Sequence, residues 1–257
     1  MFDWFYSSTC PCSPPAKDWV EYRLQWLCDE FDDHVFNGRP LVLPTAQFFP
    51  DPYRDTEDCI RRLMYRVCGY MDVDADLVDL EFVNAENAPW FVNEAGKYVP
   101  KAGGTYEWLD GRHVISLDLA ETVDLGGMVA TLSHELAHAR LLGEERVSGE
   151  EYDHELLTDL TTIFFGFGTF RANSPRVWDS QYTKWPNTDF NKPEYMSPPL
   201  IGYALAHLAW FRGEQKPAWA KYLHLNARPD FQQSLRFLNK TGDSEFKPPK
   251  LRQSHRR

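Results

Sequence analysis

The segment TLSHELAHARLLGEE, residues 131–145, places two histidines and a glutamate in a largely apolar run with helical spacing. An α-helix turns about 100° and rises about 1.5 Å per residue, so His134 and His138 lie on one face, about 6 Å apart along the axis. Two imidazoles in this arrangement can bind one Zn²⁺ ion. Glu135 points about 100° away from His134, so its carboxylate can accept a proton from a water molecule activated there.

The residues around this motif help to decide whether it indicates a metal site. The HExxH pattern also arises by chance, so the pattern alone proves little. Apolar residues of the same helix indicate that most of it is buried; they are Met128, Val129, Leu132, Leu136 and Leu142. Burying two imidazoles and a carboxylate without compensation costs several kcal/mol. Because a bound metal ion would satisfy these groups, the sequence predicts a metal site.

A third ligand is available in the next predicted helix, within YDHELLTDLTTIFFGFG. Glu155 and Asp159 are four residues apart and therefore share a helical face. One of them can bind the metal while the other accepts the spare N–H of a ligating histidine and fixes its tautomer. His154 is also a chemically acceptable zinc ligand, so three candidates remain for the third position.

At this point the sequence resembles the gluzincin branch of zinc metallopeptidases, in which HExxH is followed by ExxxD on the next helix. The resemblance covers about Gly104 to Gly168. It implies a zincin-like fold with Zn²⁺ held by His134, His138 and Glu155, and with Asp159 orienting a ligating histidine.

Two further implications come from resemblance. The strand around HVISLDL, residues 113–119, sits where zincins have the rim strand that pairs with an extended peptide. The whole chain also resembles an uncharacterised bacterial family with a similar HELAH…LTDL…FFGFG…AN pattern, which suggests no substrate.

Composition limits the possible partners and compartments. The chain has 257 residues, 43% of them hydrophobic and 25% charged, as is ordinary for a globular protein. Its net charge of −11 argues against a nucleic-acid or anionic-membrane surface, which needs clustered Lys and Arg. No apolar run reaches the length of a membrane span, and the first residues do not read as a secretion signal. Five cysteines, an odd number, favour a reducing compartment, so we expect a cytoplasmic protein.

Two of the cysteines, Cys10 and Cys12, flank Pro11. A structural zinc site usually needs two such pairs, or one pair with clustered histidines. The remaining cysteines are spaced singly, so the spacing favours free thiols in a flexible N-terminal segment, residues 1–17.

The predicted elements follow from hydrophobic spacing and from capping and turn residues. Helices are expected over residues 18–36, 56–67, 124–142, 153–165, 201–212 and 231–238. Asp124 is the expected N-cap and Gly143 the expected C′ residue of the HELAH helix. Strands are expected over residues 76–83 and, around a turn at Asp110-Gly111, within residues 103–119. Residues 39–45 are expected to be extended, and residues 175–199 to form a long ordered loop.

These elements indicate an α+β protein. We expect one zincin-like domain over residues 18–240, with a small mixed sheet and the HExxH helix, wrapped by N- and C-terminal helices. The basic tail, residues 241–257, is either a solvated end or a contact for RNA or a partner.

The favoured function is a zinc-dependent hydrolase, most simply a peptidase that acts on a peptide or protein, with Glu135 as general base. Tyr203 and His207 are either donors to an oxyanion or residues at the edge of the core. The rival is a non-enzymatic zinc-binding regulatory or partner-binding protein that retains the zincin fold. The aromatic residues within 2–6 would dock such a partner or cover the protein's own core, and the sequence leaves the oligomeric state open.

Overall fold

The computed structural model describes residues 9–31, 38–83, 91–92, 98–99, 103–118, 124–174 and 183–247. The chain divides into two compact units. One contains Met1–Leu43 with Glu155–Arg257, and the other contains Pro44–His154. The single domain expected over residues 18–240 therefore spans both units, while the aromatic residues 2–6 and most of the basic tail lie outside the described residues.

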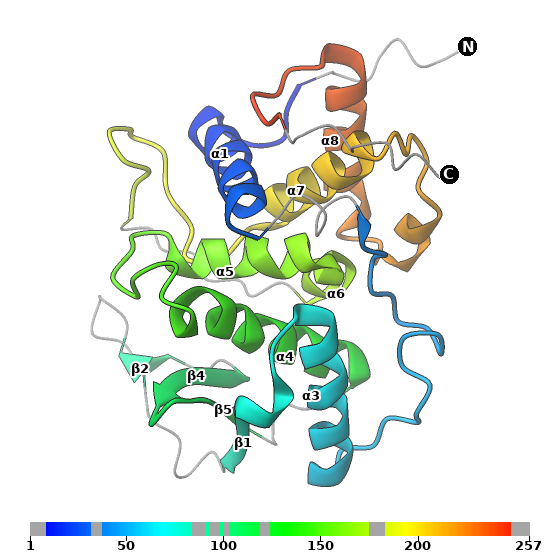
Figure 1. Ribbon diagram of the computed structural model, residues 1–257. Coiled ribbons are helices and arrows are strands. Elements are labelled where there is room, and N and C mark those ends of the chain that lie inside the picture. Colours follow the sequence, from blue (N-terminus) through cyan, green and yellow to red (C-terminus); the bar gives the residue numbers. More distant parts are fainter. Residues whose placement is uncertain are drawn as a thin grey trace, which may run out of the picture. The chain divides into compact units, whose positions relative to one another are not determined.

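A small mixed sheet lies in the unit Pro44–His154 (Figure 1). Its strands are β1 (Val78–Val83), β4 (Gly104–Leu109) and β5 (Arg112–Asp118), in the order β1-β5-β4. β5 pairs in parallel with β1 and antiparallel with β4, which confirms the expected mixed sheet. A separate antiparallel pair is formed by β2 (Phe91–Val92) and β3 (Tyr98–Val99).

The alternation of side chains in the sheet follows the sequence pattern. Val78 and Leu80 of β1 are buried, and Glu81 is exposed, because successive strand residues point to opposite faces. The turn between β4 and β5 also forms as expected: Asp110 has φ 50° and Gly111 has φ 78°. Positive φ at both central residues is what a two-residue hairpin with the right twist requires.

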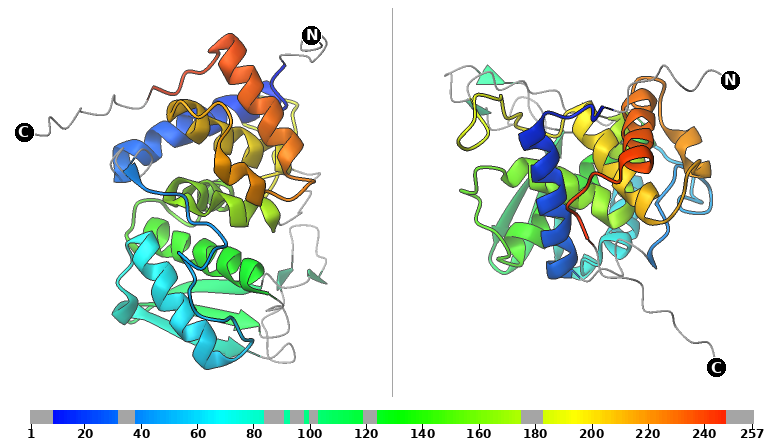
Figure 2. Two further views of the ribbon diagram at one scale, coloured as in Figure 1. Left: turned by 90° about the vertical axis from the view of Figure 1, so that its right-hand side faces the viewer. Right: turned by 90° about the horizontal axis from the view of Figure 1, so that it is seen from above.

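Two helices of this unit, α3 (Glu57–Met71) and α4 (Leu125–His138), pack against each other, and α4 also packs against β4 (Figure 2). The apolar residues at helical spacing in α3 are buried; they are Ile60, Leu63, Met64 and Val67. Thr56 occupies the N-cap position of α3, but its side chain makes no capping hydrogen bond. A 3-10 turn, η1 (Ala75–Leu77), precedes β1.

Helix α4 carries the HELAH motif and begins as predicted. The carboxylate of Asp124 accepts the N–H of Gly127 at 2.7 Å and so caps the first turn. The end of the helix differs from the prediction, because regular α-helix stops at His138 and a π-helical turn, η4, covers Ala139–Gly143. Gly143 is not the left-handed C′ residue; Glu145, with φ 55°, has the left-handed backbone.

The other unit is helical. Its helices are α1 (Pro14–Phe31), α5 (His154–Thr162), α6 (Gly168–Asn173), α7 (Pro198–Phe211) and α8 (Arg228–Thr241), with a π turn at Ile163–Phe167, η5, and a 3-10 turn at Ala218–Tyr222, η6. Helix α7 packs against both α1 and α8, so the N- and C-terminal helices share one core (Figure 1). α1 begins four residues earlier than expected, and Val20, Leu24 and Leu27 are fully buried.

The passage from α5 to α6 depends on a glycine. Gly166 has φ 96°, a conformation that other residues adopt only with strain. Its carbonyl accepts the N–H of Val42 at 3.0 Å, so the segment predicted to be extended is held against this turn. Among the helices that the structure describes, none combines the length and the apolar character needed to cross a bilayer.

Candidate metal centre

The two histidines of the HELAH motif lie in the last turns of α4, one helical turn apart. Only 1% of His134 and 7% of His138 is exposed, which is rare for imidazoles unless their polar atoms are satisfied. Their ring centroids are 4.9 Å apart and the ring planes meet at 85°. The predicted common face is therefore present, and both rings are held in a buried position.

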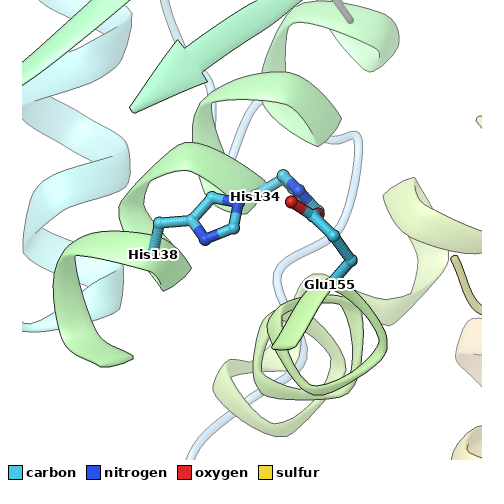
Figure 3. Close-up of side chains that lie close together, drawn as sticks. All are labelled: His134, His138 and Glu155. Carbon is cyan, nitrogen blue, oxygen red and sulfur yellow. The ribbon is translucent and has the colours of Figure 1, made fainter. Parts of the chain in front are cut away.

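Helix α5 brings a carboxylate to these rings. Its first residue, His154, belongs to the same compact unit as α4, and its ring centroid lies 6.4 Å from that of His138. Glu155 follows directly, and one ligand atom from each of His134, His138 and Glu155 lies within 4.8 Å of the others (Figure 3). Among the described residues, this is the group of His, Cys, Asp and Glu side chains that can hold a metal ion.

The donor set fits zinc. Two imidazole nitrogens and one carboxylate oxygen are ligands that Zn²⁺ accepts, and donors at about 2.1 Å from a tetrahedral ion lie about 3.4 Å from one another. The three ligand atoms, all within 4.8 Å of one another, lie in the range of that spacing. Of the three candidates for the third ligand, Glu155 is the one in this group, and His154 instead places Nδ1 3.2 Å from the carbonyl of Glu151.

Glu135 packs against the beginning of β4. It is 2% exposed, and a Cβ atom added to Gly104 would lie 3.0 Å from its Cγ and 2.9 Å from Cγ2 of Thr131. Such contacts are shorter than side chains tolerate, so a glycine at this position lets the strand approach the helix closely. The glutamate of the motif is thus held beside the end of a strand.

The strand next to Glu135 is not the one implied by resemblance to zincins. HVISLDL forms β5, whose two sides are hydrogen-bonded to β1 and β4. A strand paired on both sides has no free N–H and C=O groups with which to bind a peptide. The expectation that β5 is the rim strand is therefore wrong, and in the described sheet β4 is the edge strand next to α4.

A tyrosine that the sequence reasoning missed lies against one of the histidines. The ring of Tyr106 stacks on that of His138, with centroids 5.9 Å apart and planes at 18°, and its hydroxyl is 3.0 Å from Nδ1 of His113. Burial raises the pKa of Tyr106 to about 12, so the phenol keeps its proton, and burial lowers the pKa of His113. The sequence contains one indication of this role: Tyr106 is two residues beyond Gly104 and therefore lies on the same face of β4.

Gly143 leaves the space for this pair. A Cβ atom there would lie 2.4 Å from the hydroxyl of Tyr106 and 2.6 Å from Cε1 of His113. Gly143 is therefore required by close packing and not, as predicted, by a left-handed helix end.

Asp159 is fully buried, and Arg171 binds both of its oxygens. Nε of Arg171 donates at 2.6 Å and Nη2 at 2.8 Å, and the N–H of Met196 donates to the same carboxylate at 2.9 Å. Asp159 thus links α5 to Arg171 of α6 and to the backbone of Met196, shortly before α7. Its predicted contact with a ligating histidine stays a prediction.

Tyr203 and His207 belong to the core. Both are 0% exposed; the hydroxyl of Tyr203 donates to Glu21 at 2.5 Å, and Nε2 of His207 is 2.9 Å from the hydroxyl of Ser244. Of the two readings of this pair, the structure supports the core role and not that of oxyanion donors. Two arginines that follow the motif in the chain, Arg140 and Arg146, both form ion pairs with Glu144.

Comparison with known proteins adds no relative, since no family model, curated protein or solved structure matches the chain. The likeness to gluzincins and to the bacterial family therefore stays an expectation that rests on the motif.

Proposed function

We propose that the protein is a zinc-dependent hydrolase that cleaves peptides. The observation that carries the proposal is that ligand atoms of His134, His138 and Glu155 lie within 4.8 Å of one another. A second carboxylate, Glu135, follows the first histidine in the chain. Three protein ligands leave one coordination position open, which is the arrangement of catalytic zinc sites and not of structural ones.

Zinc, when bound by these three residues, would supply Lewis acidity for the activation of water. Glu135 accepts the proton of the attacking water and passes it to the leaving amine. Its burial beside Gly104 keeps solvent away from the carboxylate, and a dry environment strengthens its interaction with a proton donor.

The class of substrate is suggested by the edge strand. β4 begins next to Glu135 and, in the described sheet, pairs on one side only, with β5. An extended peptide can add to such an edge through main-chain hydrogen bonds, which tolerates many side-chain sequences. A peptide bound along β4 would run past the general base, so a peptidase fits this arrangement better than a hydrolase of small molecules.

Tyr106 supports the same site from the strand. Its ring packs on His138, and its hydroxyl is held by His113, so the ligand's ring plane is fixed by a neighbour on β4. Groups that orient metal ligands commonly contribute about 10–100-fold to metal affinity. We assign Tyr106 this positioning role.

The test combines metal analysis with cleavage. Purified protein should contain about one zinc per chain. The zinc-loaded protein should cleave peptides of a library, and the chelated protein should not. Cleavage should return when zinc is restored. Glu150→Gln, an exposed carboxylate, serves as the matched control and should behave as wild type. Zinc content of one without any cleavage would instead favour the zinc-binding regulatory protein, and absence of zinc would contradict both.

A further inference from the structure

The pair Cys10-Pro11-Cys12 lies in a segment that the structure anchors at several points. The amide of Gln233 on α8 donates to the carbonyl of Thr9 at 3.3 Å. The thiol of Cys12 donates to the carbonyl of Pro199, at the start of α7, at 3.4 Å. One residue further on, the carbonyl of Ser13 accepts the N–H of Lys17 at 2.9 Å, and α1 begins. The two cysteines are therefore held at the N-terminus of an 18-residue helix.

The two thiols have different environments. Cys12 is buried, with 9% of its surface exposed, and Cys10 is partly exposed. The neighbouring thiol of Cys12 is the main reason that the pKa of Cys10 is lowered, although burial opposes the shift. In the same way, the neighbouring thiol of Cys10 and burial raise the pKa of Cys12. Cys10 is thus the thiol that ionises first and can be reached from solvent, and Cys12 keeps its proton.

Charged groups from three helices face the pair. Lys17 of α1 favours the Cys10 thiolate and Glu21 of α1 opposes it. Burial is the main reason that the pKa of Tyr203 on α7 is raised, and Cys10 adds a smaller part. Asp230 on α8 adds a smaller part to the raised pKa of Cys12, after the thiol of Cys10 and burial. A thiol near a helix N-terminus and a lysine is the environment in which reactive cysteines are found.

We propose that Cys10 and Cys12 are a redox-active dithiol that closes reversibly to a disulfide, with a low-molecular-weight disulfide as the oxidant. The Cys10 thiolate attacks one sulfur of the oxidant, forms a mixed disulfide and releases the other sulfur as a thiolate. Cys12 then gives up its proton and attacks the Cys10 sulfur, and the second thiol leaves. Two protein thiols are oxidised, and one small disulfide is reduced to two thiols.

The short spacing makes the product easy to reduce. Only Pro11 separates the two cysteines, so the disulfide closes a small ring, and distorted disulfides are readily reduced. Closure also removes the S–H of Cys12 that donates to the carbonyl of Pro199, so oxidation breaks a hydrogen bond to the first turn of α7. The pair therefore has the properties of a switch and not of a structural bridge.

The other three cysteines provide internal controls. Cys28, Cys59 and Cys68 are buried thiols, and none has a cysteine neighbour two residues away. The thiol of Cys59 donates to the carbonyl of Pro52, and that of Cys68 contacts the sulfur of Met64.

The experiment exposes the reduced, zinc-loaded protein to mixtures of glutathione disulfide and glutathione, quenches with acid, and maps the products by peptide mass spectrometry. Wild type should form a Cys10–Cys12 disulfide that glutathione reverses, and Cys28→Ser should do the same. Cys12→Ser should accumulate a glutathione adduct on Cys10, because the resolving thiol is absent, and Cys10→Ser should leave Cys12 reduced. A wild type that keeps the adduct on Cys10 without closing the ring would overturn the proposal.

A second measurement needs no variant. The rate at which iodoacetamide alkylates Cys10 in wild type should reach half of its maximum below about pH 8.5, the value of an ordinary thiol. A midpoint at or above that value would show that the pair does not activate Cys10, and it would contradict the proposal even if the variants failed to fold.

Discussion

The rings of His134 and His138 lie 4.9 Å apart and nearly perpendicular, with both side chains almost fully buried on one face of α4. In the proposed hydrolase, a zinc ion bound by both rings would satisfy ring nitrogens that burial removes from water. His134→Ala or His138→Ala should each abolish zinc binding, because the two remaining ligands hold zinc poorly. His224→Ala, which changes an exposed histidine, should leave zinc content at the wild-type value. Unchanged zinc content in both motif variants would refute the site.

Glu155 and Asp159 should respond differently to substitution. Glu155→Ala should empty the site, whereas Asp159→Asn should keep zinc but weaken its binding by about 10–100-fold, as changes beside a ligand typically do. Zinc affinity is measured by competition with a chelator. If Asp159→Ala empties the site and Glu155→Ala leaves it full, the two roles are exchanged.

Asp159 should also matter for stability without metal. Its carboxylate binds the guanidinium of Arg171, which is 2% exposed, so Asp159→Ala leaves a buried charge unpaired. Removing one partner of such a pair costs about 3–5 kcal/mol. Chelated Asp159→Ala should therefore lose that much free energy of unfolding in urea, and chelated Glu155→Ala should not.

Gly143 should be intolerant of a single methyl group. Gly143→Ala places a Cβ 2.4 Å from the Tyr106 hydroxyl and 2.6 Å from His113, and overpacking of this kind costs about 1–3 kcal/mol. Gly149→Ala is the matched control, because a Cβ there meets no atom within 4 Å, and its effect should stay within about 0.5 kcal/mol. Adding Tyr106→Phe to Gly143→Ala should recover part of the loss, which a double-mutant cycle measures. Equal stability of the two alanine variants would contradict the close packing.

His207 should make the helical unit sensitive to acid. Complete burial lowers its pKa to about 4, while Glu21 opposes and Lys17 assists the shift. Its unfolded pKa is about 6.5, so the unfolded state binds more protons between these values. The stabilisation is present in full above about pH 6.5 and is lost as the pH falls towards 4, by about 3 kcal/mol in total.

The measurement for His207 is the slope of unfolding free energy against pH in chelator. Wild type should lose stability between about pH 6.5 and pH 4 more steeply than His207→Asn, since the other titratable groups are the same in both proteins. Parallel slopes would show that His207 titrates normally in the folded protein.

The sequence could predict those features that depend on nearby residues. Period-two alternation located β1, helical spacing located α3 and α4, and Asp124 and the Asp110-Gly111 turn bounded their elements. The pairing of His134 with His138 follows from helix geometry alone, so it too could be predicted.

Features that depend on distant contacts could not be found in this way. Gly143 looked like a helix end, and its actual constraint comes from side chains of β4 and β5. Tyr203 and His207 are spaced like residues of a site, and only the contact with Glu21, 182 residues away for Tyr203, shows that they are core residues. Likewise, resemblance to zincins implied that HVISLDL is a rim strand, and pairing with β1 makes β5 central.

Glu135→Gln is the most direct test of the proposed hydrolase, because it keeps the size of the side chain and removes the group that accepts a proton. General bases contribute about 10²–10⁴-fold, so cleavage of the best library peptide should fall by at least 10²-fold. Zinc content should be unchanged, and the melting temperature should be equal or slightly higher, because a buried charge has been removed. A variant that is fully zinc-loaded, less stable and equally active would contradict the account.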